Sequence, residues 1–199
     1  MRTPLAALPL VLSACVTTSA SGPGVMDPTA FASATAASAR KMEIDADGTG
    51  HFTKVSVEHV DAALAPAALQ AMVQSTWPGA TLQKYEREVY ADVGMVHEVE
   101  VKTADARECE LSMTDAGALY YTECKVAQAE MAPGVAATMS STLPGGTLVE
   151  AEVRKGPKFD ECRIEATAGG RTYYLRIGSD GKLISKAAVL QAEVNVPVP

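Results

Sequence analysis

A repeat of about 65 residues constrains this chain more than any other feature of its sequence. Residues 65–82 and 131–148 align without a gap, and both contain Pro near the start and Pro-Gly-(Ala/Gly)-Thr-Leu at the end. Apolar residues in each copy recur at helical spacing, so each copy predicts a helix that begins near its Pro and stops at Pro-Gly. These apolar residues are Leu69, Met72, Val73 and Trp77 in the first copy, and Val135, Met139 and Leu143 in the second.

After each Pro-Gly the apolar period changes to two, which is typical of half-buried antiparallel strands. Segments 95–102 and 108–113 alternate in this way in the first copy, as do 162–166 and 173–177 in the second. Glycine turns at 115–117 and 179–181 close a hairpin in each copy. A further strand pair, 40–44 and 52–57, precedes the first helix. We therefore predict an α+β fold of tandem helix-plus-antiparallel-sheet units, with helices packed on one sheet face.

The order of helix, Pro-Gly-(Ala/Gly)-Thr, charged strand, His-Glu-Val-Glu-Val (97–101) and Gly-turn hairpin resembles the PepSY-like family. That family has the fold of the beta-lactamase-inhibitor protein. The resemblance covers about residues 40–189, in tandem. It implies a noncatalytic exported module, with roles proposed in peptidase inhibition or ligand binding. It supplies no functional motif that can be transferred residue by residue.

The N-terminal residues 1–14 predict a cleavable export signal, because Arg2 precedes an apolar run far shorter than the roughly 20 residues needed to span a bilayer. Leu12-Ser-Ala-Cys15 resembles the lipobox of bacterial lipoproteins, which implies lipid on Cys15 and cleavage before it. The alternative is an ordinary secretory signal with an incidental cysteine. Val16 replaces the Asp that retains some lipoproteins at the inner membrane, which favours the outer membrane, facing the periplasm or the cell surface.

The rest of the chain divides by composition. Residues 15–38 are mostly small or polar and predict a flexible tether. The first unit, with its preceding hairpin, is expected at 39–128 and the second at 129–199. The formal charge of −7 argues against nucleic acid, so membrane contact is expected through the lipid alone, on a monomer.

Three cysteines follow Cys15. Pairing Thr114 with Leu119 around the hairpin turn places Cys109 opposite Cys124, near enough for a disulfide in an oxidising exported compartment. The same register places Met113 opposite Tyr120. Cys162 is expected to be a buried free thiol, with a reactive thiol as the alternative.

Residue clusters typical of catalysis are few, and we expect neither an enzyme nor a cofactor. His97-Glu98 begins a zinc-protease motif, but Val101 stands where the second His is required. Asp45 and Asp47 open a loop similar to an EF-hand, yet Ser56 occupies the position of its bidentate Glu. A Gly-rich hairpin turn is the preferred interpretation of that loop, and weak calcium binding is the alternative.

The sheet face without helices is the predicted binding surface. It combines acids with Tyr and Arg, which are common anchors at protein interfaces. We therefore predict a noncatalytic envelope protein that binds another envelope protein, with inhibition of a peptidase or other hydrolase as one possible outcome. The alternatives are a small-ligand or weak calcium-binding lipoprotein and an ordinary solvated face. The predicted partner-binding residues are Glu98, Glu100, Glu110, Tyr121, Arg163, Tyr174 and Arg176.

Overall fold

The computed structural model describes residues 39–59 and 61–190. The predicted signal peptide, the lipidation site Cys15 and the predicted tether lie outside these residues. No helix within the described part of the chain has the length and apolar character needed to cross a membrane.

The strands are β1 (Ala39–Ala46), β2 (Phe52–His59), β3 (Thr81–Tyr90), β4 (Gly94–Lys102), β5 (Glu108–Thr114), β6 (Leu119–Lys125), β7 (Thr147–Gly156), β8 (Phe159–Ala168), β9 (Arg171–Gly178) and β10 (Leu183–Ala188). The helices are α2 (Ala67–Thr76) and α3 (Pro133–Thr142), with short 3-10 helices η1 (Ala62–Leu64) and η2 (Gln128–Glu130).

The predicted fold class, tandem helix-plus-sheet units, is wrong. Within residues 39–59 and 61–190, all ten strands form one antiparallel sheet in sequence order, accompanied by only two short α-helices. The junction is the pairing of β6 with β7, where Thr122–Lys125 runs against Glu152–Lys155. Separate units would each leave the backbone of an edge strand unpaired, and this pairing satisfies both edges at once. The repeat is therefore a duplication within one sheet.

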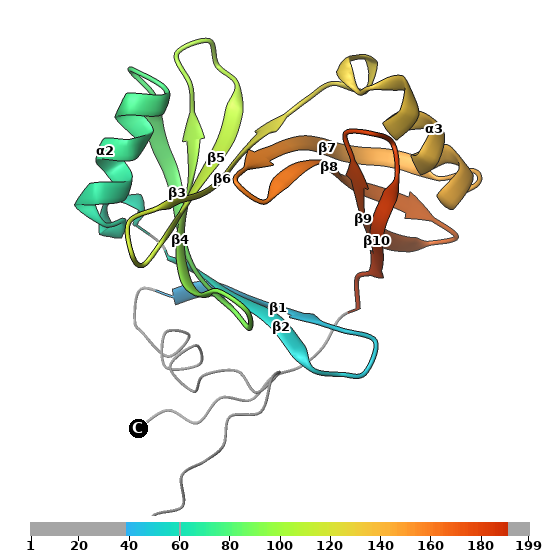
Figure 1. Ribbon diagram of the computed structural model, residues 1–199, viewed down its shortest axis with the longest axis horizontal. Helices are drawn as coiled ribbons and strands as arrows, with labels where there is room; N and C mark the ends of the chain where they lie inside the picture. Colours follow the sequence, from blue (N-terminus) through green and yellow to red (C-terminus); the bar gives the residue numbers. More distant parts are fainter. Residues whose placement is uncertain (1–38, 60, 191–199) are drawn as a thin grey trace, which may run out of the picture.

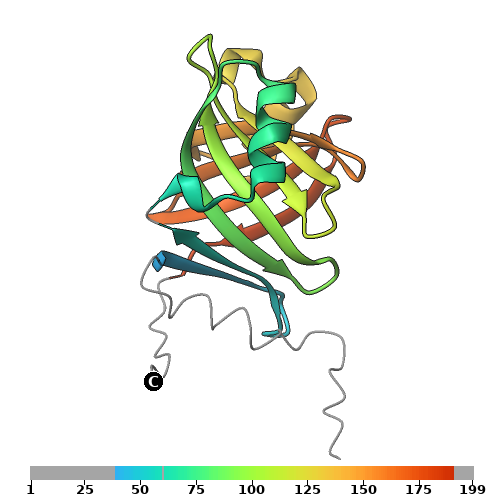
Figure 2. The same ribbon diagram turned by 90° about the vertical axis from the view of Figure 1, so that its left-hand side faces the viewer.

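Both helices lie on the outer face of the bent sheet (Figure 1), and α2 crosses its strands obliquely (Figure 2). Leu69 and Val73 of α2 pack on a core from β3, β4 and β5, while Val135 and Met139 of α3 pack on the equivalent core from β7, β8 and β9. Each helix ends where predicted, and Gly79 and Gly145 after it have positive φ values of 82° and 71°. The predicted helical faces are thus confirmed.

The predicted disulfide between Cys109 and Cys124 is present, and Cys162 is a buried free thiol, as expected. Nearer the turn of the β5–β6 hairpin, the strand register differs from the predicted register by one residue. Met113 pairs with Leu119 instead of Tyr120, because the register shifts after Ser112 and Tyr121. Tyr120 is the extra residue of this β-bulge.

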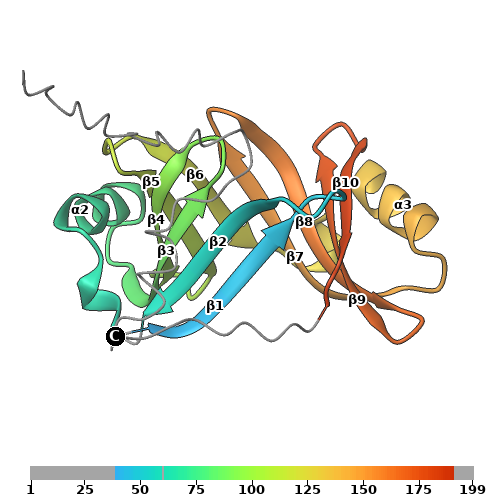
Figure 3. The same cartoon turned by 90° about the horizontal axis from the view of Figure 1, so that it is seen from below.

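Hairpin β1–β2 crosses the open side of the arch (Figure 1) and its turn reaches toward the strands of the second half (Figure 3). We call the sheet face turned away from α2 and α3 the concave face. The first hairpin and the concave face together line a single cleft.

Candidate functional site

The concave face carries a row of ionisable side chains across six strands. Antiparallel register places each member directly opposite the next, so their side chains are neighbours on one face. The row, from β3 to β8, is Lys84, Glu100, Glu110, Glu123, Arg154 and Glu161. Glu100, Glu110 and Glu123 are consecutive acidic residues in this row, so acidic side chains lie opposite one another on three neighbouring strands. Burial and then the charge of Glu98 raise the pKa of Glu110 well above its usual value.

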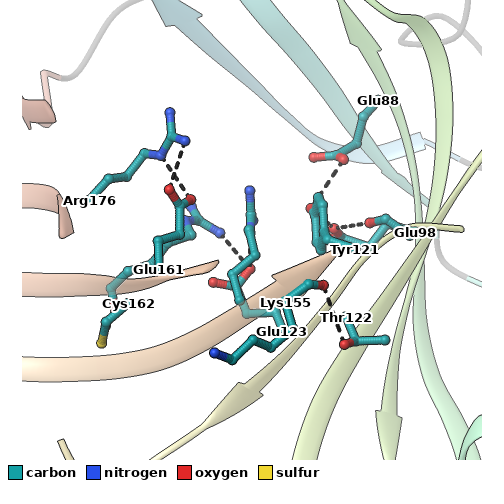
Figure 4. Close-up of polar contacts among 12 residues, drawn as sticks. Glu88, Glu98, Tyr121, Thr122, Glu123, Lys155, Glu161, Cys162 and Arg176 are labelled. Carbon is teal, nitrogen blue, oxygen red and sulfur yellow. Dashed lines mark hydrogen bonds and ion pairs between the residues drawn. The ribbon is translucent and has the colours of Figure 1, made fainter. Parts of the chain in front are cut away.

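Glu123 anchors the centre of this row. Its side chain is fully buried, and its Oε2 atom accepts hydrogen bonds from Arg154 Nε at 2.9 Å and Arg163 Nη1 at 3.1 Å. The guanidinium of Arg154 also lies 3.7 Å from the ring centroid of Tyr121. On the next strands, Glu161 accepts from Nε and Nη2 of Arg176 at 2.9 and 2.8 Å. Buried carboxylates therefore hold three arginines in fixed positions, and Figure 4 shows one of these pairs, Glu161 with Arg176.

A second carboxylate group lies at the β3–β4 side, where oxygens of Glu86, Glu88 and Glu98 lie within 4.8 Å of one another. Glu98 accepts hydrogen bonds from Ser112 Oγ at 2.8 Å and from the hydroxyl of Tyr121 (Figure 4). Burial, followed by the charge of Glu88, raises the pKa of Glu98 to about 8. Tyr and Ser hydroxyls therefore satisfy a carboxyl group that holds its proton at neutral pH.

Glu88 faces basic and phenolic donors instead. Its Oε1 accepts from Lys54 Nζ at 3.1 Å, and its Oε2 accepts from the Tyr90 hydroxyl at 3.1 Å. This links the first hairpin, which carries Lys54, to the wall of the concave face.

A cleft of about 430 Å³ opens between the first hairpin and the concave face. Aromatic rings line one side of it, with Tyr120 and Phe159 at 5.1 Å between centroids and Tyr90 and Tyr120 at 5.4 Å. The β-bulge is what allows both Tyr120 and Tyr121 to contact Phe159. The basic residues that line the cleft are Lys54, Arg154, Lys158, Arg163 and Arg176, and the acidic ones are Asp45 and Asp92.

The predicted partner-binding residues lie on this face with unequal exposure. Tyr174 is 42% exposed and the side chain of Arg176 is 41% exposed. Tyr121 and Glu98 are 1% and 6% exposed, which corrects the expectation that they face solvent. Arg154 and Phe159 pack over the Tyr121 ring, and Tyr121 in turn covers Glu98. Glu100, Glu110 and Arg163 are half-buried.

Asp45 and Asp47 take part in the first hairpin in different ways. Asp47 Oδ1 accepts hydrogen bonds from Thr49 N, Thr49 Oγ1 and His51 N at 2.8, 2.7 and 3.1 Å. These bonds, those of Thr49 above all, lower the pKa of Asp47 to about 2. The hairpin turn that the sequence favoured is thus the local structure, and Asp45 lies 3.8 Å from Lys54 Nζ at the edge of the cleft.

Sequence reasoning missed Glu88, Glu123, Arg154 and Lys158. A signal existed for one of them, because Glu150, Glu152 and Arg154 alternate along β7 as the recognised residues do along β4. No local pattern places Lys54 of β2 and Arg163 of β8 at the same cleft, since that arrangement depends on how the hairpin crosses the arch.

No protein-family model matches the chain, and no curated protein is similar to it in sequence. Solved structures are similar in fold. A BLIP-like protein from Bacteroides fragilis superposes with a TM-score of 0.51 and 17% identity over 66% of this chain and 92% of that one. A DUF2874 family protein from Bacteroides uniformis gives 0.51 and 14% over 62% and 89% of the two chains. A protein from Bacteroides eggerthii that is proposed to be periplasmic gives 0.50 and 10% over 62% and 88%. Such identities establish the fold alone: this protein has a BLIP-like fold.

Proposed function

We propose that this protein is a noncatalytic, lipid-anchored envelope protein that binds another protein through its concave face. The observation that carries the proposal is the cleft of about 430 Å³ on that face, walled by fixed arginines and aromatic rings. Ionisable groups held away from water are costly, and apolar residues would pack a sheet more stably. A face that retains them in a concave, open position is suited to recognition.

Three observations support the envelope location. Leu12-Ser-Ala-Cys15 is a lipobox-like sequence. The Cys109–Cys124 disulfide suits an oxidising compartment. One protein of similar fold is proposed to be periplasmic. We place the anchor in the outer membrane, after removal of residues 1–14, with 15–38 as the tether.

Lipidation is tested at Cys15. The Cys15→Ser variant should lose labelling by palmitate and leave the membrane fraction, with Cys162→Ser as the matched control that keeps both. Palmitate labelling that persists in Cys15→Ser would refute the anchor.

The two residues most often used in catalysis, a free Cys and a His, lie away from the cleft, which supports a binding role for it. Cys162 is buried on the helix side, and its pKa is raised to about 11, chiefly by burial. His97 also lies on the helix side, where Nδ1 contacts the Tyr85 hydroxyl at 2.8 Å and Nε2 contacts Asp115 at 3.3 Å. Neither residue lines the cleft.

A photo-cross-linking amino acid at Lys158, on the cleft rim, tests the binding face in cells. The same amino acid at Ser140, exposed on α3, is the matched control. We expect a discrete cross-linked envelope protein from position 158 and none from position 140. Equal products from both positions, or none from 158, would contradict the proposal. The captured protein is then assayed with and without this chain, which tests whether binding inhibits a hydrolase.

The size of the cleft favours a small-molecule ligand as the second candidate, because about 430 Å³ falls within the range of roughly 300–1,000 Å³ for such sites. Native mass spectrometry of the envelope-purified protein distinguishes the two. A retained small adduct that is released on denaturation would support the second candidate.

A further inference from the structure

We propose that the cleft is a carboxylate-binding site, so that the partner segment it receives is acidic. This rests on the proposed function and adds the chemistry of the bound group. The cations proposed to contact this acidic segment are Lys158, Arg163 and Arg176.

The lining of the cleft is basic although the chain is acidic. The chain as a whole carries a formal charge of −7, yet the lining of the cleft contains five basic residues against two acidic ones. The carboxylates that pair with the arginines, Glu123 and Glu161, are 1% and 3% exposed and do not line the cleft. The basic groups therefore face the cleft, and their counter-ions lie behind them.

Arg163 and Arg176 have guanidinium N–H groups that their glutamate partners do not use. A guanidinium offers five N–H groups in a planar fork. Arg176 gives Nε and Nη2 to Glu161, and its Nη1 donates no hydrogen bond within the part of the chain that the structure describes. Arg163 gives Nη1 to Glu123, and its Nε and Nη2 likewise donate none to the described residues. Because the carboxylate partners fix these planes, the remaining donors are already oriented for an incoming oxyanion.

Lys158 supplies a further argument. It is exposed in the turn between β7 and β8, lines the cleft, and forms no ion pair within residues 39–59 and 61–190. Lys155, near the end of β7, does pair, with Asp160. A lysine without a carboxylate partner at the mouth of a basic cleft attracts an acidic segment and contacts it without losing an existing bond.

The aromatic wall strengthens these contacts. Tyr90, Tyr120 and Phe159 form one side of the cleft, and ion pairing is stronger beside apolar rings than in open water.

The test uses the mature full-length protein in detergent and a labelled tetraglutamate peptide, acetylated and amidated at its ends. Binding is followed by fluorescence anisotropy in low salt and in high salt. A tetraglutamine peptide with the same end groups is the uncharged control. Inorganic phosphate is the competitor that represents a free anion. We expect tetraglutamate to bind at least about tenfold more tightly than tetraglutamine, with weakening in high salt.

Two variants assign the effect to the cleft. Lys158→Glu should weaken tetraglutamate binding about tenfold, and Arg176→Lys should weaken it less, because the charge stays while the fork is lost. Lys182→Glu makes the same charge change at an 83% exposed side chain in the β9–β10 turn and should leave binding within about twofold.

Three results would overturn the inference. The first is equal affinity for tetraglutamate and tetraglutamine, and the second is an equal loss of tetraglutamate affinity in Lys158→Glu and Lys182→Glu. The third is displacement of tetraglutamate by phosphate at the same total concentration of negative charge. If any of these results were obtained and the cross-link from position 158 were still observed, the protein-binding function would stand and the carboxylate site would not. Loss of the cross-link together with intact tetraglutamate binding would instead remove the protein-binding function and keep the carboxylate site.

Discussion

Individual side chains on the concave face have properties that their free amino acids lack. Near-complete burial and then the charge of Glu88 raise the pKa of Glu98 to about 8, and they outweigh the hydrogen bond from Tyr121, which lowers it. Glu152 behaves similarly, since burial and then the charge of Glu123 raise its pKa to about 7. Protonation of these groups is therefore coupled to folding near neutral pH.

The Glu98→Gln variant tests that coupling. Because the pKa of Glu98 in the folded protein lies above its value of 4.5 in an unfolded chain, its contribution to stability is complete below about pH 4.5 and is lost as pH rises toward 8. The slope for one proton is up to roughly 1.4 kcal/mol per pH unit. Gln keeps an acceptor for Tyr121 and Ser112, so the variant should gain stability relative to the wild type as pH increases.

Urea unfolding between pH 5 and 9 measures this difference, with Glu100→Gln on the same strand as the control for loss of one half-buried carboxylate. A constant difference between Glu98→Gln and the wild type over this range would contradict the raised pKa of Glu98.

At the scale of elements, each helix is held by the strands beneath it. Val73 occupies in α2 the position that Met139 occupies in α3, and both are buried, at 0% and 6% exposed. Met72, one residue earlier, is only half-buried. The structure therefore fixes which residues of the repeat are equivalent in packing.

Val73→Asp and Met139→Asp should each destabilise the fold severely, because an unpaired buried carboxylate costs several kcal/mol. Met72→Asp should cost less, since its side chain can reach solvent. Chemical denaturation of the three variants provides the ranking. Equal losses for Met72→Asp and Val73→Asp would show that the face of α2 is assigned incorrectly.

The disulfide acts on the β5–β6 hairpin, and its cysteines are 15 residues apart in sequence. Chain-entropy arguments give about 3 kcal/mol for a loop of that size, and a hairpin already ordered by β4 and β7 should show about 1–3 kcal/mol. Reduction should lower Tm by several degrees and leave the fold intact, because in the second half Tyr173 pairs with Ala188 at the matching positions.

Nonreducing peptide mapping checks the pairing, and thermal melts with and without reductant give the shift. The Cys109→Ala/Cys124→Ala variant is the control and should show no response to reductant. A shift that remains in this variant would mean that the disulfide is not its source.

For the whole molecule, the continuous sheet predicts cooperative unfolding. The two cores lie under α2 and α3, and the β6–β7 pairing joins them through the backbone. The chain provides one reporter for each half: the single Trp, Trp77, packs on the first core, and the free thiol of Cys162 lies in the second. Trp fluorescence and Cys162 labelling in a Cys15→Ser background should give the same urea midpoint. Separate midpoints would indicate that the halves fold independently.

Local features of this protein were determined by its sequence alone. Both helices, their Pro-Gly ends, the glycine turns and the Cys109–Cys124 pair follow from patterns contained within a few residues or one hairpin. The polar residues of β4 and β9 could also be placed on one face, because strand alternation is strictly local.

Only the tertiary structure decided how these parts combine. The β6–β7 pairing made one sheet from two repeats, the bulge at Tyr120 built the aromatic wall, and the crossing hairpin brought Lys54 toward Arg163. It also decided that Tyr121 and Glu98 are covered while Tyr174 remains exposed. These outcomes depend on which distant strands meet and on how far the sheet bends. Both are set by the summed pairing and packing of the whole chain, and no single segment of the sequence encodes them.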